Sequence, residues 1–358
     1  MADPEIPAPE APARPPQPGR LGLKDVAAAA GVSVKTVSNV LNDRPHISAA
    51  TRQRVQEAVQ RLDYRPNPAA RMLKEGRTGI IALAVPDVEL PYFAELASAV
   101  HRAAEQVGYT VLLDQTAGDP DQEMLVAKGF RGHLIDGLIL SPIALQPEQL
   151  RECATDRPTV LIGERFYDAR VDHINIDNVA AARTAVQHLI AQGRRRIAML
   201  GDTDFYLGTV ALRRQGYEQE LADAGLPLDE ELVLPGGRFR RQDGLQAVQR
   251  LVESGAEFDA VFAFNDTLAL GAIRALADHG LRVPDDVAVV GFDDIEDGRY
   301  SCPRLTTIAP NKDQIAELAI RRLVGRLTGE LPETADDPES ADHLAATHRL
   351  IVRESSQP

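Results

Sequence analysis

Short apolar runs alternate with amphipathic stretches along residues 78–358. The runs have the length and composition of buried strands, and they lie at Ile80–Val85, Thr110–Leu113, Gly137–Leu140, Thr159–Ile162, Ile197–Leu200, Ala260–Phe264 and Val287–Val290. Stretches of helical character separate them, at Pro91–Val107, Val179–Gln192, Arg213–Ala224 and Thr267–His279. Alternating strands and helices predict parallel sheets with helices on both faces. Because about 280 residues exceed one ordinary core, we expect two such α/β units.

Residues 21–65 show a different pattern, that of three short helices. Apolar spacing predicts these helices at Leu23–Ala30, Val34–Leu41 and Ser48–Leu62. The first helix ends at Gly31 and the second is capped by Ser33, so a very short turn joins them. Two helices joined in this way are typical of the helix-turn-helix motif. Packing of the three helices would leave one face of the second helix free.

That free face carries side chains suited to DNA. The start of the second helix of a helix-turn-helix enters the major groove. The side chains on this face are Val34, Lys35, Ser38 and Asn39. Lysine can donate to guanine, asparagine can pair with adenine, and valine can contact a thymine methyl group. Hydroxyls, a helix N-terminus and a cation are expected to meet phosphates, and these candidates are Thr36, Ser48, Thr51 and Arg52. The alternative is a solvated face on a module that binds other proteins.

The net charge of −14 is unevenly distributed. Residues 21–77 hold ten Lys and Arg against five Asp and Glu, so the rest of the chain is strongly acidic. A locally basic module makes nucleic acid a reasonable partner despite the acidic total. Residues 1–20 contain seven prolines and no signal-peptide pattern, which predicts a disordered tail on a cytoplasmic protein. The two cysteines, Cys153 and Cys302, are then expected to stay reduced.

The segment between the two parts, residues 66–76, has the sequence of a very short helix. Asn67 can cap it, Pro68 suits its first turn, and Gly76 can end it. Isolated helices shorter than about 12 residues are marginal in water. A joint of such low stability is suited to act as a switch.

Polar side chains follow several of the predicted strands. Ligands of parallel sheets bind beyond the carboxyl ends of the strands. The polar residues at these ends are Glu164, Arg165, Asn265, Asp266, Asp293 and Asp294, and Arg213 is expected to open the helix Leu212–Ala224. Carboxylates accept pairs of hydroxyls and Arg donates a planar fork, so the set suits a polyhydroxylated ligand. Phe93, Phe205 or Phe292 is placed to cover the apolar face of a sugar. Strand-end acids can instead be helix caps, which is the expectation for Asp266.

No enzyme motif is recognisable in the sequence. It has no P-loop, no dinucleotide fingerprint, no His-Glu-x-x-His and no Gly-x-Ser-x-Gly. The eight histidines are scattered without metal-binding spacing. Asp293 and Asp294 are adjacent at a strand end and are expected to point apart. We therefore predict no catalytic residue, no metal and no cofactor.

Short motifs mark the chain from Leu23 onwards. In the N-terminal part they are Leu23-Lys-Asp-Val-Ala27, Gly31-Val-Ser33, Thr36-Val-Ser38, Val40-Leu-Asn42 and Leu62-x-Tyr-Arg-Pro-Asn67. In the C-terminal part they are Pro91-Tyr-Phe93, Arg213-x-x-Gly-Tyr217, Asn265-Asp266-x-x-Ala269-x-Gly271, Val283–Asp294, Pro303-x-Leu-Thr-Thr307 and Leu350-x-x-Arg-x-Ser355. Together these motifs closely resemble the lactose repressor (LacI/GalR) family of bacterial transcriptional regulators.

The resemblance implies roles for residues of the N-terminal part and the joint. Val34, Lys35 and Asn39 match the base-reading positions, although many members carry Arg where Asn39 stands. Residues 66–76 match a hinge helix that orders when the dimer meets DNA. In it Asn67 is the cap, Ala70 lies on the face where two such helices pack, and Leu73 is the wedge in the minor groove. An apolar wedge of this kind unstacks and kinks the duplex.

The resemblance also implies a two-lobe core like that of periplasmic sugar-binding proteins. Lobe one is expected at residues 77–177 and 310–330, and lobe two at residues 178–309 and 345–358, with residues 329–345 as a surface loop. By matching position, Arg213, Asn265 and Asp293 are the effector contacts. The weaker candidates are Tyr92, Phe93, Glu164 and Asp177. Many members have Asp-Arg where Glu164 and Arg165 stand, so the effector of a relative cannot simply be transferred.

These expectations describe a ligand-controlled transcriptional repressor that acts as a homodimer on a pseudo-palindromic operator. Its effector would be a sugar or sugar derivative bound between the lobes. One alternative is a solute-binding protein without a DNA role, which would need a signal peptide and no basic module. Another is a carbohydrate enzyme, which turnover of a sugar by the pure protein would reveal.

Overall fold

The computed structural model describes residues 22–41, 45, 47–64, 77–129, 134–146, 148–149, 157–164, 171–332 and 342–357. The chain forms two compact units, Met1–Thr78 and Gly79–Pro358. The proposed hinge residues Asn67, Ala70 and Leu73 lie outside the described residues, as does Arg165.

The N-terminal unit contains the three predicted helices. They are α1 (Leu23–Ala30), α2 (Val34–Leu41) and α3 (Ala49–Arg61). Val26, Val37 and Val55, one from each helix, are fully buried and form the centre of a small core. Gly31 ends α1 in the left-handed conformation, with φ of 63°, which glycine adopts without steric cost. The helix-turn-helix arrangement predicted from the sequence is therefore confirmed.

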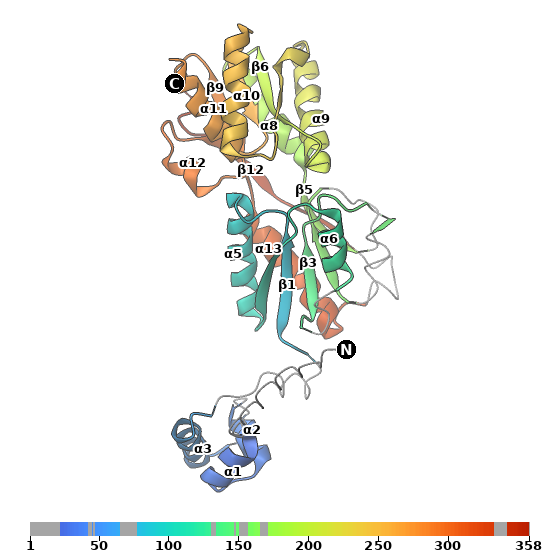
Figure 1. Cartoon of the computed structure of the whole chain (residues 1–358), viewed down its shortest axis with the longest axis vertical. Helices are drawn as coiled ribbons and strands as arrows, with labels where there is room; N and C mark the ends of the chain where they lie inside the picture. The colour runs from blue at the N-terminus through green and yellow to red at the C-terminus, as the bar shows by residue number, and fades with distance from the viewer. Residues whose placement is uncertain are drawn as a thin grey trace, which may run out of the picture. The chain divides into compact units, whose positions relative to one another are not determined.

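The C-terminal unit is built on two six-stranded sheets, which we use to define its two lobes (Figure 1). The first lobe has the strand order β11-β5-β4-β3-β1-β2. Its strands are β1 (Ile80–Val85), β2 (Thr110–Gln115), β3 (Gly137–Leu140), β4 (Thr159–Ile162), β5 (Asp172–Ile176) and β11 (His343–Ala346). All of its neighbouring strands run parallel. Helices α5 (Pro91–Gln106), α6 (Pro120–Ala127) and α13 (Lys312–Thr328) belong to this lobe.

The second lobe has the strand order β12-β10-β9-β8-β6-β7. Its strands are β6 (Ile197–Asp202), β7 (Val233–Pro235), β8 (Ala260–Ala263), β9 (Ala288–Phe292), β10 (Thr306–Pro310) and β12 (His348–Ile351). The edge strand β12 pairs antiparallel with β10, so this sheet is not entirely parallel as predicted. Its helices are α8 (Asn178–Ala191), α9 (Leu207–Asp223), α10 (Arg241–Ser254), α11 (Asp266–Asp278) and α12 (Glu296–Tyr300).

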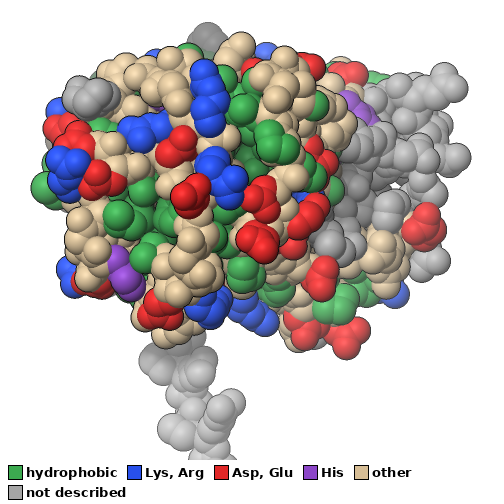
Figure 2. Space-filling view, turned by 90° about the horizontal axis from the view of Figure 1, so that it is seen from above, with side chains coloured by type: hydrophobic (Ala, Val, Ile, Leu, Met, Phe, Trp, Pro, Cys, Tyr) green, Lys and Arg blue, Asp and Glu red, His purple; other side chains and the backbone are tan. Residues whose placement is uncertain are grey.

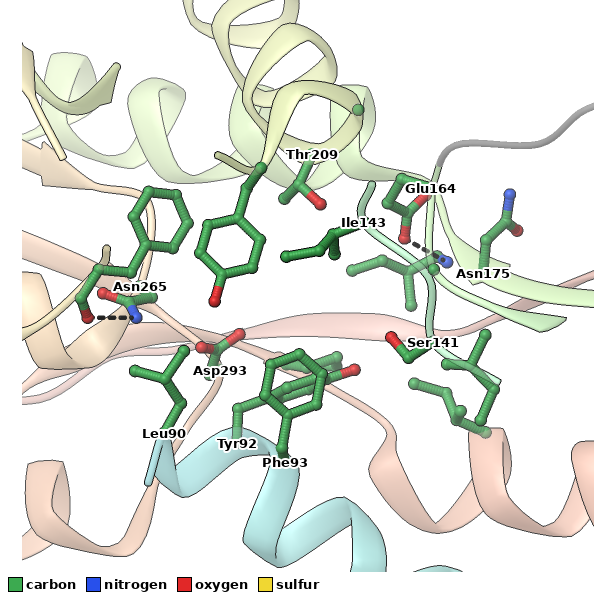
Figure 3. Close-up of a pocket in the computed structure, with 18 of the residues that line it drawn as sticks. Leu90, Tyr92, Phe93, Ser141, Ile143, Glu164, Asn175, Thr209, Asn265 and Asp293 are labelled. Atoms are coloured by element: carbon green, nitrogen blue, oxygen red, sulfur yellow. Dashed lines mark hydrogen bonds between the residues drawn. The ribbon is translucent and has the colours of Figure 1, made fainter. Parts of the chain in front are cut away.

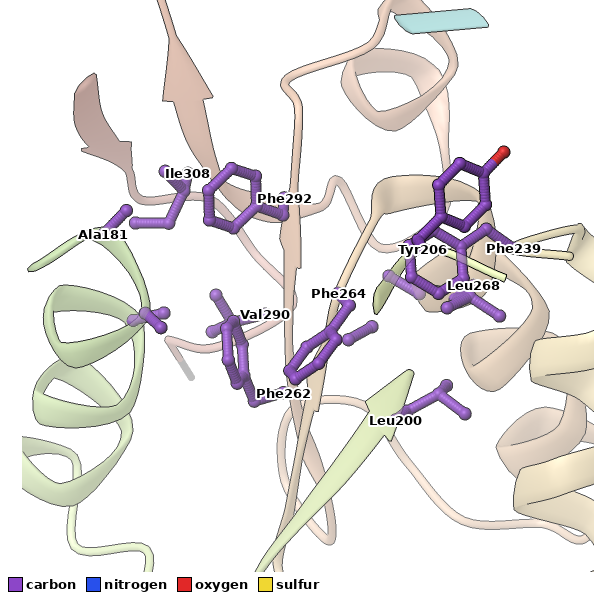
Figure 4. Packing of buried hydrophobic residues seen from close by; sticks show 14 of the residues in the cluster. Ala181, Leu200, Tyr206, Phe239, Phe262, Phe264, Leu268, Val290, Phe292 and Ile308 are labelled. Carbon is purple, nitrogen blue, oxygen red and sulfur yellow. The ribbon is translucent and has the colours of Figure 1, made fainter. Parts of the chain in front are cut away.

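Buried aromatic residues lie at the centre of the second lobe (Figure 4). Phe262, Phe264 and Phe292 are fully buried beside aliphatic side chains such as Val290. Burying one such side chain contributes roughly 1.5–3 kcal/mol. This rigid core fixes the strand ends, from which the polar residues of the following loops project.

The chain passes between the lobes three times, after β5, after β10 and between β11 and β12. The expected surface loop at residues 329–345 is wrong at its end, because His343–Ala346 is strand β11 and pairs with β5. Ala345 therefore belongs to the sheet of the first lobe. The chain enters the second lobe for the last time after Ala346, two residues later than the expected start at residue 345. The expectation that Arg213 opens a helix is also wrong, since α9 begins at Leu207.

The outer surface carries charges of both signs. Figure 2 shows acidic and basic side chains interspersed over one face, with small apolar areas between them. Exposed ion pairs such as Arg274–Asp278 and Arg282–Asp286 illustrate this mixture. Among the residues that the structure describes, no helix is long and apolar enough to cross a membrane.

Candidate ligand pocket and nucleic-acid interface

A pocket of about 1000 Å³, its open mouth included, lies between the two lobes (Figure 3). Segments that follow strands of both sheets line it. The first lobe contributes Leu90, Tyr92, Phe93, Ser141, Ile143, Ile162, Glu164, Asn175 and Ile176, and the second contributes Tyr206, Thr209, Arg213, Phe239, Asn265, Thr267, Asp293 and Ile295. The carboxyl ends of both sheets thus face one space, the usual location of ligands in open α/β sheets.

Arg213 is the buried cation of this pocket. It projects from α9 and is only 7% exposed. Its Nε donates to Asn178 Oδ1 at 2.7 Å, and its Nη1 donates to the Phe264 carbonyl oxygen. The guanidinium carbon lies 3.4 Å from the centroid of the Phe292 ring. Burial lowers the pKa of Arg213, while the nearby carboxylates of Asp293 and Glu164 act in the opposite direction.

Asn265 and Asp293 lie near one another at one end of the pocket (Figure 3). Asn265 caps α11, because its Oδ1 accepts from the Leu268 amide at 2.8 Å. Its Nδ2 donates to the Phe239 carbonyl at 3.1 Å. Asp293 has a φ of 114°, which costs free energy for a residue with a side chain. Strain of this kind is typical of functional sites, where surrounding structure holds a side chain in position.

Two acids of the pocket ionise with difficulty. Burial raises the pKa of Glu164 to about 7, against a smaller lowering by the Ile176 amide and Arg213. Burial likewise raises the pKa of Asp293 to about 7, with Arg213 and Lys312 acting against it. Lys312 is held nearby, since its Nζ donates to the Asp293 carbonyl at 2.5 Å and pairs with Glu95 at 2.6 Å. At neutral pH, small changes in surroundings can therefore change the charge of either acid.

The raised pKa of Glu164 predicts a specific pH dependence of stability. Unfolded, this carboxyl has a pKa near 4.5, against about 7 when folded. Between these values the folded state holds more protons, so its stability falls as pH rises, and above the higher value the loss is constant. The variant Glu164→Gln cannot ionise. We expect its stability relative to the parent to increase from about pH 5 to about pH 7 and then level off, as measured by urea unfolding. A difference that stays constant across this range would contradict the raised pKa.

Aromatic side chains cover both sides of the pocket. Tyr92 and Phe93 are in edge contact, with centroids 5.1 Å apart. Tyr206 stacks on Phe239 at 4.7 Å, with 27° between the rings. The sequence interpretation included Phe93 but missed Tyr206 and Phe239, which follow β6 and β7. The sequence did offer a weak signal for Tyr206: it comes shortly after the apolar run of β6, and aromatic residues that follow a buried strand are candidates for a ligand site.

Three residues considered from the sequence have other positions. Among the described residues, Asp177, Phe205 and Phe292 are not part of the pocket lining. Asp177 is exposed and caps α8, where it accepts from the Ala180 amide at 2.9 Å. Phe292 supports Arg213 from behind, and Phe205 lies against the Arg238 guanidinium at 4.4 Å. The proposed role of Asp266 as a cap is wrong, because Asn265 caps α11 and Asp266 accepts from Thr307 Oγ1 at 2.6 Å.

Polar contacts connect the two lobes beside the pocket. Arg240 of the second lobe pairs with Asp87 and, at 2.9 Å, with Glu89 of the first. Glu95 of the first lobe accepts from the Glu296 amide of the second at 2.9 Å. Surface ion pairs typically contribute under about 1 kcal/mol each. Contacts this weak can hold a closed arrangement and still release it when a ligand leaves.

A buried carboxylate outside the pocket shapes one of its walls. Glu123 of α6 is fully buried. It accepts from the amides of Ile143, Ala144 and Leu145 at 2.8, 3.0 and 2.9 Å. Ile143 lines the pocket. Three backbone donors held by one carboxylate fix the loop that carries this side chain.

Replacing Glu123 with Gln should release this loop. The substitution exchanges an acceptor oxygen for a donor, and each unpaired buried amide costs about 1–3 kcal/mol. We expect the amides of residues 143–145 to exchange with deuterium at least tenfold faster, as followed by mass spectrometry. Asp121→Asn, an exposed change on the same helix, is the matched control. Unchanged exchange in the Glu123 variant would show that the loop is held by other contacts.

The N-terminal unit presents the predicted face of α2. Val37 and Val40 point into the core, whereas Val34 and Lys35 are exposed and Ser38 and Asn39 are half-buried. Val34 is 40% exposed. The structure therefore brings all four proposed base-reading residues to one side of the helix.

The proposed phosphate contacts lie at the starts of α2 and α3. Ser33 caps α2, with its Oγ accepting from the Thr36 amide at 3.1 Å. Ser48 caps α3 and donates to Thr51 Oγ1 at 2.9 Å. Arg52 follows in the first turn of α3. Helix N-termini attract anions because their first amides have no intrahelical partner.

Comparison with known proteins connects both regions to one family. The family model for bacterial regulatory proteins of the lacI family matches residues 22–67, and that for periplasmic binding proteins and the sugar binding domain of the LacI family matches residues 78–353. The regulator DegA of Bacillus subtilis is 33% identical over 341 residues, which cover 94% of this chain and 98% of DegA. The repressor PurR of Histophilus somni is 33% identical over 313 residues, covering 86% of this chain and 92% of PurR.

Solved structures agree with this relationship. A LacI-family regulator from Sanguibacter keddieii is 41% identical, with a TM-score of 0.69, and the match covers 79% of this chain and 100% of that one. A complex of the regulator CelR with cellobiose gives 32% identity and a TM-score of 0.68, covering 94% and 100% of the two chains. A Lac repressor dimer bound to operator and an anti-inducer gives 26% identity and a TM-score of 0.80, covering 94% and 99%. This chain belongs to the LacI family of bacterial transcriptional regulators, proteins that bind DNA under the control of a ligand.

Proposed function

We propose that this regulator is a repressor, and that a sugar or sugar derivative bound between its lobes controls its affinity for an operator. One observation carries the proposal: a pocket at the carboxyl ends of both sheets, in which Arg213, Asn265 and Asp293 meet aromatic side chains. Carboxylate, amide and guanidinium groups together can satisfy many hydroxyls, and aromatic rings can cover the apolar face of a sugar. The solved complex of CelR with cellobiose supports this class of ligand.

We infer that the DNA-binding form is a homodimer on a pseudo-palindromic operator. A dimer places two recognition helices about one helical turn apart, so the operator repeats its half-site with matching symmetry. The Lac repressor dimer on its operator supports this arrangement. We place the protein in the cytoplasm, where it has access to DNA, and we assign it no catalytic activity.

The mechanism follows from linkage between two sites. A ligand that contacts both lobes stabilises their closed arrangement, and it shifts DNA affinity by its preference for one state over the other. We propose residues 66–76 as the element whose order changes, with Asn67 as cap, Ala70 at the helix contact and Leu73 in the minor groove. In this account the effector acts on the joint, and the recognition helices keep their structure.

The proposal is tested by selecting an operator from random oligonucleotides and then titrating the complex with a sugar library. We expect at least one sugar to change the operator affinity about fivefold or more, the lower end of typical coupling energies. If no sugar alters DNA affinity although the selected operator binds tightly, the proposed class of ligand is wrong.

The proposed base contacts predict a change of sequence preference. Replacing Asn39 with Ala should relax the preference at one base pair of each half-site, at about 1–3 kcal/mol per lost contact. Repeating the selection with this variant measures the effect position by position. Lys24→Ala removes an exposed charge from α1 and is the matched control. An unaltered preference in the Asn39 variant would exclude its role in base reading.

A further inference from the structure

Acidic side chains outnumber basic ones around the pocket. Arg213 is the buried cation of its wall, whereas Glu164 and Asp293 are both acids. Lys312 adds a second cation, but Glu95 pairs with it at 2.6 Å. Among the described residues at the pocket, acids therefore outnumber bases by one. A positively charged ligand would favour the ionised form of these acids.

Glu164 has an unused hydrogen-bonding position in this pocket. Its Oε1 accepts from the Ile176 amide at 3.4 Å. Its Oε2 and the Asn178 Nδ2 are both buried without a partner at hydrogen-bond distance within the described part of the chain, although the Asn178 side chain is close enough to lower the pKa of Glu164. Ile143 and Ile162 are among the apolar side chains of the same wall. A carboxylate oxygen buried in such surroundings is costly unless something donates to it. A ligand that enters the pocket can supply a stronger donor to Oε2 than the neutral Asn178 amide.

The opposite end of the pocket suits hydroxyl groups. Figure 3 places Glu164 near Thr209 and Ile143, and places Asp293 and Asn265 towards the other end. Tyr206 lines the pocket, and its hydroxyl is buried without a partner in the described structure. Neutral donors and acceptors lie beside Asp293, together with the cations Arg213 and Lys312. Glu164 lies at the other end of the pocket as a separate acidic position.

We propose that the effector is an amino sugar or a similar polyhydroxylated amine, with its hydroxyls beside Asp293 and its ammonium group against Glu164. This proposal rests on the proposed function, of which it narrows the ligand class. An ammonium group donates charge-assisted hydrogen bonds, which are roughly twice as strong as neutral ones.

The surroundings of Glu164 favour a cation over an anion. The pKa of Glu164 is raised chiefly by burial, and Asp177 adds to this while Arg213 opposes it. A bound ammonium group would favour the ionised carboxyl in the same way as any adjacent cation. A phosphorylated sugar would instead bring negative charge towards two acids. Arg213 could offset this only in part, since Asn178 and the Phe264 carbonyl already occupy two of its donors.

Matched sets of sugars test the proposal by isothermal titration calorimetry on the full-length protein. Each set comprises an amino sugar, its parent sugar, its N-acetyl derivative and the parent 6-phosphate, in the glucose, galactose and mannose series. We expect at least one amino sugar to bind tenfold or more tightly than the other three members of its set. Glu164→Gln should reduce this advantage at least tenfold, whereas Glu105→Gln, an exposed change in the same lobe, should leave it intact.

The outcomes separate this inference from the proposed function. If neutral sugars bind and amino sugars have no advantage, or if Glu164→Gln leaves the advantage unchanged, the amine assignment is overturned and a sugar effector stands. Tighter binding of a 6-phosphate would overturn it as well. If no sugar of any kind binds, in these sets or in the wider library, both the amine assignment and the sugar class fail.

Discussion

The variant Arg213→Met is expected to lose effector binding by about 100-fold or more. Hydrogen bonds to charged groups contribute about 1.5–3 kcal/mol each. Removal of this cation would also take away a charge that lowers the pKa values of both Asp293 and Glu164. Methionine retains much of the side-chain length and can still lie against the Phe292 ring, on which the guanidinium now rests. The loss is measured by calorimetry with the sugar that responds best.

Arg214→Ala provides the matched control for this prediction. Arg214 is the next residue of the same helix, and its side chain forms ion pairs at the surface with Glu218 and Glu230. It is not among the described residues that line the pocket. Thermal unfolding of both variants distinguishes lost binding from lost folding. If both the Arg213→Met and the Arg214→Ala variants bind the effector as tightly as the parent, the pocket does not hold the effector.

The variant Asp172→Ala is expected to lower the free energy of unfolding of the C-terminal unit by about 3–5 kcal/mol, the usual cost of removing one partner from a buried ion pair. Asp172 has no exposed side-chain surface. It accepts from Arg322 Nη2 at 2.7 Å and from Arg326 Nε at 2.9 Å. Although burial alone would raise the pKa of Asp172, hydrogen bonds from these two residues keep it below its usual value.

Loss of Asp172 would leave the two arginines of α13 buried without their shared acid. The Asp342 amide, which donates to the same carboxylate at 3.0 Å, would also lose its partner. Urea unfolding followed by circular dichroism measures the effect. Asp278→Ala, which breaks the exposed pair with Arg274, should cost under about 1 kcal/mol. Equal stability of the two variants would show that the buried cluster does not support the first lobe.

The sequence predicted those strands whose side chains are apolar on both faces. All seven predicted apolar runs overlap observed strands. Six of these strands lie inside a sheet, where cover by helices makes a strand read as a continuous hydrophobic segment, and the seventh, β2, is an edge strand. Strand β5 was missed because its sequence, Asp172 to Ile176, alternates polar and apolar residues. Its acid is acceptable there only because α13 supplies two arginines from more than a hundred residues away. No local pattern contains that information.

The site was predictable in part for a similar reason. Asn265 and Asp293 are polar side chains at buried strand ends, Arg213 is a buried cation on α9, and the structure brings all three to one pocket. Phe239 could not be identified, since it follows a strand of only three residues and has a φ of 64°. Glu123 was also missed, because its role depends on a loop twenty residues later in the chain. Contacts between lobes and between distant loops depend on the tertiary structure, and the periodicity of the sequence does not reveal them.

The central claim is that ligand binding between the lobes and DNA binding are coupled. It is tested most directly by measuring two affinities. Fluorescence anisotropy gives the Kd of the selected operator without and with a saturating concentration of the responsive sugar. Calorimetry gives the Kd of that sugar without and with the operator. We predict that the sugar changes the operator Kd at least fivefold and that the operator changes the Kd of the sugar by the same factor, as linkage requires. Identical operator affinity with and without bound sugar would contradict the account.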